Sequence, residues 1–143
     1  MSAKEAQAAG IYFYELPNQL NYDTVDPLIR DVCHSINESG WVWTAESCQG
    51  HPDADYAFPR AGNTKPMLRL VCREPDAGEM LNSLLAACGA NTDLDVHHPI
   101  LLEVCELSRQ NGWVPIIVYA RACTTYERNQ GIAVYRRFAA NLR

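Results

Sequence analysis

The chain has 143 residues, of which 48% are hydrophobic, and a formal net charge of −5 at pH 7. This length and apolar content are typical of one folded domain and exclude a disordered chain. No apolar run approaches the roughly 18 residues of a membrane-spanning helix, and residues 1–10 contain no hydrophobic signal region, so we expect a soluble, cytoplasmic protein. We expect a flexible N-terminus over residues 1–10 and a single globular domain over residues 11–143.

The charge is unevenly distributed. Residues 121–143 contain five arginines and one acid, for a net charge of +4, whereas the remaining residues carry −9. An acidic body disfavours binding to extended nucleic acid, because such binding needs many Lys and Arg side chains on one face. It is compatible with a compact anionic ligand, with a basic protein partner or homo-oligomer, or with solubility alone.

The cysteine spacing argues against a disulfide framework. The six cysteines are 15 to 24 residues apart, without any Cys-x-x-Cys pair. Most lie in apolar periodic segments, so we expect free cysteines that are buried as small hydrophobic residues. The cysteines are Cys33, Cys48, Cys72, Cys88, Cys105 and Cys123.

In chain order, the aromatic and β-branched residues 11–16 predict a first strand. A helix should follow, with Asp26 as N-cap and Pro27 in its first turn, and end at Gly40. Its predicted apolar stripe is Leu28, Ile29, Val32, Cys33 and Ile36. Residues 41–48 predict a second strand.

Residues 49–66 form a long loop rich in Pro and Gly, and loops of that length usually bind or cover something. Met67–Arg73 reads as a third strand. A capping box of Asp76 and Glu79 then opens a helix that ends at Gly89. Its predicted buried face is Ala77, Met80, Leu81, Leu84, Leu85 and Cys88.

Residues 99–111 are interpreted as a helix, with a strand over residues 101–107 as the alternative. Trp113–Ala120 predicts a further strand, and Pro115 indicates an edge position. A second capping box, Thr124 and Glu127, opens a last helix. Its predicted core face is Ile132, Tyr135, Phe138, Ala139 and Leu142, with Arg128, Arg136 and Arg137 mostly on the other side. The whole is a mixed α/β (α+β) domain with helices packed on a sheet of four or five strands.

Part of the sequence is repeated with an offset of 72 residues. Pro27, Val32-Cys33 and Gly40-Trp41-Val42 correspond to Pro99, Val104-Cys105 and Gly112-Trp113-Val114. Either a helix-turn-strand unit is duplicated, or two similar junctions converged on the same residues.

The second strand ends in a polar motif that we take as the candidate ligand site. Donor groups at a strand end beside a long loop are a common way to display chemistry on a rigid element, and the glycine permits a sharp turn or a close approach to a ligand. The histidine can contact a phosphate or exchange a proton, which makes His51 the candidate catalytic residue. The motif residues are Thr44, Ser47, Cys48, Gln49, Gly50 and His51.

Two other chemistries fit parts of this motif. Cys48-x-x-His51 is half of a zinc pattern, but its completion needs two more ligands, and His97-His98 are the only clustered candidates, so no metal is expected. A Cys48–His51 nucleophile pair would need the base within reach of the thiol, which sequence proximity does not establish. The loop acids Asp53 and Asp55 fit a solvated role.

The motif resembles that of the wybutosine-synthesizing tRNA methyltransferases. In that family a helix ending near Ile-Asn precedes a strand with a Thr-Thr-Ser-Ser-Cys-Ser-Gly-Arg-like motif, similar to Ile36-Asn37 followed by residues 44–50 here. The family's next strand, ending in Cys-Arg, and its apolar helix are similar to residues 66–73 and 81–89. The resemblance covers about residues 27–89.

The resemblance implies a pocket for S-adenosylmethionine or a nucleic-acid group, with Arg73 beside Ser47, Cys48 and Gly50. The family's Arg is replaced by His51, and residues after 89 do not follow the family. We therefore expect a small nucleotide-type, anionic ligand at the motif. The alternatives are an RNA-modifying S-adenosylmethionine-dependent methyltransferase relative and an acidic inhibitor or adaptor, of phage type, that binds a protein partner.

Overall fold

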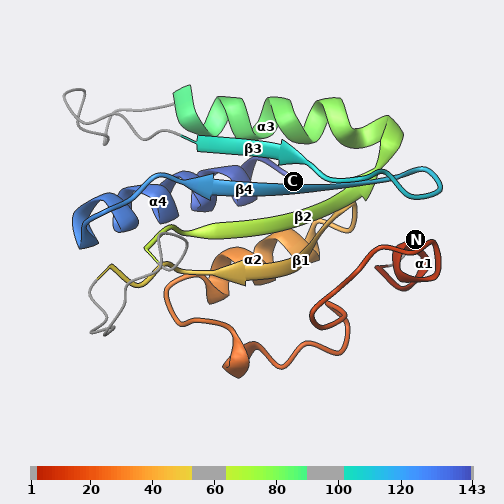
Figure 1. Cartoon of the computed structure of the whole chain (residues 1–143), viewed down its shortest axis with the longest axis horizontal. Coiled ribbons are helices and arrows are strands. Elements are labelled where there is room, and N and C mark those ends of the chain that lie inside the picture. Colours follow the sequence, from red (N-terminus) through yellow and green to blue (C-terminus); the bar gives the residue numbers. More distant parts are fainter. Residues whose placement is uncertain (1–2, 53–63, 90–101, 143) are drawn as a thin grey trace.

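The computed structural model describes residues 3–52, 64–89 and 102–142. Its centre is a four-stranded antiparallel sheet in the order β1-β2-β4-β3 (Figure 1). The strands are β1 (Val42–Cys48), β2 (Met67–Arg73), β3 (Leu102–Glu106) and β4 (Trp113–Ala120). The bounds predicted for the third strand and for Trp113–Ala120 are those of β2 and β4.

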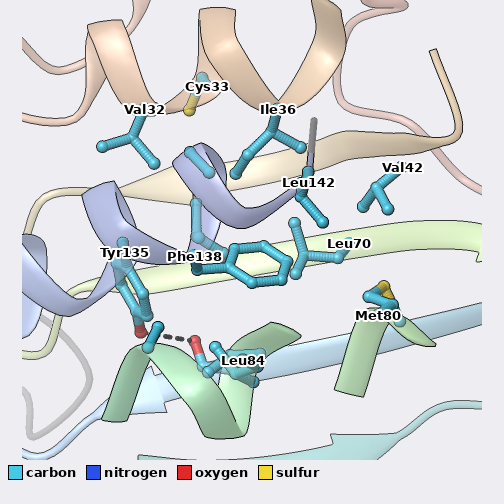
Figure 2. Packing of buried hydrophobic residues seen from close by; sticks show 14 of the residues in the cluster. Val32, Cys33, Ile36, Val42, Leu70, Met80, Leu84, Tyr135, Phe138 and Leu142 are labelled. Carbon is cyan, nitrogen blue, oxygen red and sulfur yellow. Dashed lines mark hydrogen bonds between the residues drawn. The ribbon is translucent and has the colours of Figure 1, made fainter. Parts of the chain in front are cut away.

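Three helices pack on one face of this sheet: α2 (Arg30–Glu38), α3 (Ala77–Gly89) and α4 (Thr125–Asn141). Figure 2 shows Phe138 of α4 beside Leu70 of β2, with side chains of α2 on one side and of α3 on the other. The side chains labelled there, all of them buried, are Val32, Cys33, Ile36, Val42, Leu70, Met80, Leu84, Tyr135, Phe138 and Leu142. The predicted α+β fold class is confirmed. None of the helices in the described ranges has the length and apolar character of a transmembrane span.

The N-terminal residues cover part of the opposite face of the sheet, over β1, β2 and the start of β4. Ala3 and Ala6 of α1 (Ala3–Ala8) are buried against it, in a cluster with Trp43 and Trp113, whose ring centroids lie 5.8 Å apart. The segment predicted as a flexible N-terminus therefore contains a packed helix. In Figure 1 the chain from α1 to α2 passes along the outer edge of β1.

The strand predicted over residues 11–16 is wrong. Ile11, Phe13 and Leu16 are buried, but this segment meets β1 through a backbone hydrogen bond from Tyr14 N to Ala45 O (2.9 Å) rather than a ladder. A bulge between Thr44 and Glu46 interrupts the regular pairing of β1 at this point. Burial of these apolar side chains and the single backbone bond to Ala45 hold the segment against β1.

Two predicted helices differ in detail from the observed ones. Helix α2 begins at Arg30, after a turn, so Asp26 is not its N-cap. Helix α3 follows a 3₁₀ turn, η3 (Glu74–Asp76), and buries Met80, Leu84 and Ala87, whereas Leu85 is 68% exposed. Helix α3 thus has more apolar residues than its buried face accommodates.

The helix expected over residues 99–111 is wrong, and the alternative strand is present as β3. The 72-residue echo therefore joins two different structures, because Val32-Cys33 lie in α2 but Val104-Cys105 lie in β3. A duplicated helix-turn-strand unit is excluded. The two segments share a glycine with positive φ shortly before a strand, Gly40 before β1 and Gly112 before β4.

Strand β4 lies between β2 and β3, so the edge position inferred from Pro115 is wrong. Pro115 O accepts from Leu107 N (2.9 Å), on the side of β4 that faces β3. The N and O atoms of one strand residue point to the same side, so the missing N–H also faces β3. There the ladder ends at the pair Glu106 and Ile116, and no bond to β2 is lost.

The last helix matches its prediction closely. Thr124 is the N-cap of α4 and its Oγ1 accepts from Glu127 N (3.1 Å). The five residues predicted for its core face are all buried. Arg128 is the exception on the outer side, since only 4% of it is exposed.

Another short element, the 3₁₀ turn η1 (Tyr22–Thr24), lies in the connection from α1 to α2. Its Asn21 cap accepts from Asp23 N (3.0 Å). After this turn, Asp26 lies beside Cys48, the last residue of β1.

Candidate functional site

The end of β1 places three potential ligand groups together. The carboxylate of Asp26, the thiol of Cys48 and the imidazole of His51 all lie within 4.8 Å of one another. Cys48 and His51 come from the predicted motif, whereas Asp26 joins them from the turn before α2. The sequence pattern predicts a helix cap at Asp26, and the Asp-Pro pair gives no signal for its position beside β1.

Hydrogen bonds tie the two chain segments to each other. Gln49 N donates to Asp26 Oδ2 (3.0 Å), and Leu28 N donates to Gln49 Oε1 (3.0 Å). The same Asp26 oxygen lies 3.4 Å from His51 Nε2. Gln49 therefore orients the carboxylate with its backbone and caps the following turn with its side chain. This is a positioning role that the motif itself did not indicate.

Gly50 makes the turn that brings His51 back toward Cys48. Its φ is +79°, and a Cβ added here would lie 2.6 Å from Thr64 O and 2.8 Å from Pro66 N. A side chain at this position would therefore overlap backbone atoms, which cannot move away as a flexible side chain would. The carbonyl of Gly50 accepts from Arg128 Nη1 (3.0 Å).

Arg128 is a residue that sequence reasoning missed, because it was placed on the outer side of α4. Its guanidinium is buried, and its Nε donates to Asn129 Oδ1 (2.8 Å). Through the bond to Gly50 it connects α4 to the motif turn. Helical spacing gives no signal for an arginine that points inward to meet a loop carbonyl.

The electrostatics of Cys48 disfavour a thiolate nucleophile. Burial raises the pKa of the Cys48 thiol, the Gly50 N–H at 3.4 Å from its sulfur lowers it, and Asp26 raises it through charge and a hydrogen bond. The thiol therefore keeps its proton at neutral pH. The side chain that hydrogen-bonds the Cys48 thiol is Asp26, whereas a nucleophile pair requires His51 as the base.

Ser47 and Thr44 face the helices. Ser47 makes a side-chain hydrogen bond with Cys33 of α2, and this bond lowers the pKa of the Cys33 thiol, which burial raises to about 11. Thr44 Oγ1 accepts from Asn37 Nδ2 (2.9 Å), and Thr44 N donates to Asn37 Oδ1 (2.8 Å). Both residues fasten β1 to α2.

A cavity of about 240 Å³ opens between β1 and the chain that leads to α2. Three acidic residues line it, Glu15, Asp26 and Glu46, together with the 75% exposed Tyr14. Sequence reasoning missed the cavity, because residues 14–26 reach β1 only through the fold. Its full lining is Tyr14, Glu15, Leu20, Thr24, Val25, Asp26, Thr44, Ala45, Glu46 and Ser47.

Arg73 does not join these residues. Cys48 pairs with Met67 at one end of β2, and Arg73 is the last residue at the other end, about 20 Å away at the usual rise of a strand. Its guanidinium pairs with Glu5 of α1 (2.7 Å) and lies 4.9 Å from the ring centroid of Trp113. These contacts give Arg73 a role in holding α1 on the sheet.

Other predicted candidates lie outside the described residues, namely the histidine pair at 97 and 98 and the loop acids at 53 and 55. All six cysteines are described, and all are free.

No family model, curated protein or solved structure matches this chain. The resemblance to the wybutosine-synthesizing methyltransferases thus stays a prediction from the sequence.

Proposed function

We propose that this protein binds a small nucleoside-type ligand in the cavity between β1 and residues 14–26. The observation that carries the proposal is the lining, which combines the three acidic residues Glu15, Asp26 and Glu46 with an exposed tyrosine, Tyr14, in one small cavity. A concave site with a few convergent polar groups is typical of a ligand-binding pocket.

The charge of the lining leads us to replace the anionic, nucleotide-type ligand expected from the sequence with a different ligand class. A phosphate would face three carboxylates, and two like charges 4 Å apart repel by about 1 kcal/mol in water and about 4 kcal/mol near a protein surface. A nucleobase instead offers N–H donors to carboxylates and a flat ring for contact with Tyr14. We therefore place a neutral or cationic base or nucleoside in the cavity, rather than a polyphosphate.

The size of the cavity supports the same choice. At about 240 Å³ it is smaller than the roughly 300–1,000 Å³ of pockets for drug-sized ligands. Glu46 is held by Arg69 (3.8 Å), and Glu15 accepts from Asn21 N (3.3 Å), so two of the acceptors have partners that orient them. A small, rigid ligand suits a site whose groups are already held in place.

The proposal concerns binding and includes no reaction. His51 lies next to this site through Asp26, so it is the residue to test if turnover is found. RNA methylation and the binding of a protein partner stay predictions from the sequence, because no contact among the described residues favours either.

Calorimetric titration of metal-free protein with adenosine, guanosine, cytidine and uridine, and with the matching triphosphates, tests the proposal. We expect at least one nucleoside to bind more tightly than the triphosphate of the same nucleoside. Glu46→Gln should weaken binding about 10- to 150-fold, since a hydrogen bond to a charged group contributes about 1.5–3 kcal/mol.

Glu103→Gln is the matched control, because Glu103 is also a strand glutamate paired with a basic side chain, Lys65 at 3.5 Å, but lies on β3. It should leave affinity unchanged. Tighter binding of triphosphates, or equal affinity of the Glu46 and Glu103 variants, would refute the proposed ligand class.

A further inference from the structure

The cluster at the end of β1 combines three different donor types. Asp26, in the turn before α2, offers a carboxylate oxygen. Cys48, at the end of β1, offers a sulfur, and His51, in the loop after β1, offers an imidazole nitrogen. Among the described residues this is the group of three or more such side chains that gathers closely enough to hold a metal ion. Sulfur, nitrogen and carboxylate oxygen are the donors that zinc takes in proteins.

The separations fit a tetrahedral ion. Zinc bonds of about 2.3 Å to sulfur and about 2.0–2.1 Å to nitrogen or oxygen place neighbouring donors about 3.3–3.6 Å apart. His51 Nε2 and Asp26 Oδ2 are already 3.4 Å apart, and all three donors are within 4.8 Å. Closure around an ion needs a shift of about 1 Å at the most distant donor, which a side-chain rotation provides.

The groups around the donors are those that a metal site needs. Gln49 N donates to Asp26 Oδ2 (3.0 Å), and Gly50 N approaches Cys48 Sγ (3.4 Å), so backbone N–H groups meet both anionic donors. Arg128 fixes the turn itself through the carbonyl of Gly50. The side chains of His51 and Asp26 are 30% and 32% exposed, which leaves access for an ion and for a water molecule.

We propose that Asp26, Cys48 and His51 bind one Zn²⁺ ion, with the fourth coordination position open. Binding replaces the proton of the Cys48 thiol: the S–H bond breaks, a sulfur–zinc bond forms and the proton leaves to solvent. The carboxylate and the thiolate then match the two positive charges of the ion, with neutral imidazole as the third donor. Three protein ligands and an open position are the arrangement of catalytic rather than structural zinc sites.

This inference goes beyond the proposed function and does not rest on it. Asp26 lines the cavity as well as belonging to the cluster, so an ion here would lie beside the proposed ligand. It would then be placed to polarise a ligand oxygen or a bound water molecule. Because the nucleoside titrations use metal-free protein, failure of either proposal leaves the other standing.

The test is titration of the metal-free protein with Co²⁺, which takes zinc sites and reports its ligands by absorption. We expect one Co²⁺ per chain, a near-ultraviolet sulfur-to-cobalt charge-transfer band and visible bands of the intensity typical of four-coordinate cobalt. Zn²⁺ should displace the cobalt stoichiometrically. Absence of the charge-transfer band at one equivalent would overturn the proposal.

Variants separate the three donors. Cys48→Ser should abolish the charge-transfer band, and His51→Gln and Asp26→Asn should each weaken Zn²⁺ affinity at least about 100-fold, since loss of mere outer-shell partners costs 10- to 100-fold. Cys105→Ser, which changes an exposed cysteine of β3, is the control and should change nothing.

Folding is checked separately, by circular dichroism and thermal unfolding of each metal-free variant. His51 is partly exposed, so His51→Gln should fold even if Cys48→Ser does not. Unchanged Zn²⁺ affinity in a folded His51→Gln protein, or loss of the cobalt band in Cys105→Ser, would refute the site.

Discussion

Substitution of Gly50 by alanine tests whether the motif turn is held as tightly as the structure indicates. Gly50 and Gly40 share the same φ of +79°, but a Cβ on Gly50 would lie 2.6–2.9 Å from three backbone atoms, whereas a Cβ on Gly40 meets nothing within 4 Å. The left-handed conformation alone costs a non-glycine residue about 1–2 kcal/mol. Overpacking adds about 1–3 kcal/mol.

We therefore expect Gly40→Ala to lower the free energy of unfolding by about 1–2 kcal/mol and Gly50→Ala by about 2–5 kcal/mol. Urea denaturation followed by circular dichroism measures both, with the midpoint compared at equal slope. The pair isolates the contact of Gly50 with residues 64–66, because the backbone strain is common to both variants. Equal losses in the two variants would show that the turn does not pack against that segment, and the position of His51 would then be unsupported.

Three further predictions concern groups around the sheet. Arg128→Lys keeps the charge but shortens the reach to Gly50 O, so it should lower the free energy of unfolding by about 1.5–3 kcal/mol in urea denaturation; an unchanged midpoint would contradict the buried bond. Trp113→Phe should lower stability by about 1–3 kcal/mol without changing ligand affinity, because Trp113 packs at the end of the sheet remote from the motif, and a large affinity loss at equal stability would disprove this. Burial raises the pKa of the Cys33 thiol to about 11 and that of the Cys72 thiol to about 12. Because these thiols lose their protons at lower pH in the unfolded chain, the free energy of unfolding should fall as pH rises above about 9. Urea midpoints that stay constant from pH 8 to pH 10.5 would show that these thiols are not buried.

Some of the fold could be predicted from the sequence because its signals are local. Met67–Arg73 and Trp113–Ala120 are apolar runs bounded by turn residues, and both are central strands buried by helices on one side. The capping box of Thr124 and Glu127 fixes the start of α4 by a hydrogen bond within one turn. Such features depend on residues only a few positions apart.

Weak local signals gave the wrong structure in two places. Residues 103–106 of β3 are exposed on both faces, so they carry no two-residue alternation, and their polar positions fit a helix equally well. Residues 11–16 have the aromatic and β-branched content of a strand, but such content indicates only that their side chains fit a half-buried surface. It does not establish a ladder, and the segment makes one backbone hydrogen bond to β1 instead.

The candidate site likewise combines local features, which the sequence predicts, with contacts between distant segments, which it does not. The sequence by itself determined that Cys48 and His51 would stand at a strand end around a glycine turn, because that placement depends on adjacent residues. Only the tertiary structure decided that Asp26, 22 residues before Cys48, meets them, and that Arg128 crosses from α4 to hold Gly50. Contacts between residues far apart in the chain depend on how α2 and α4 pack on the sheet. The apolar pattern within a helix predicts which of its faces is buried, but it does not predict which loop its polar side chains contact.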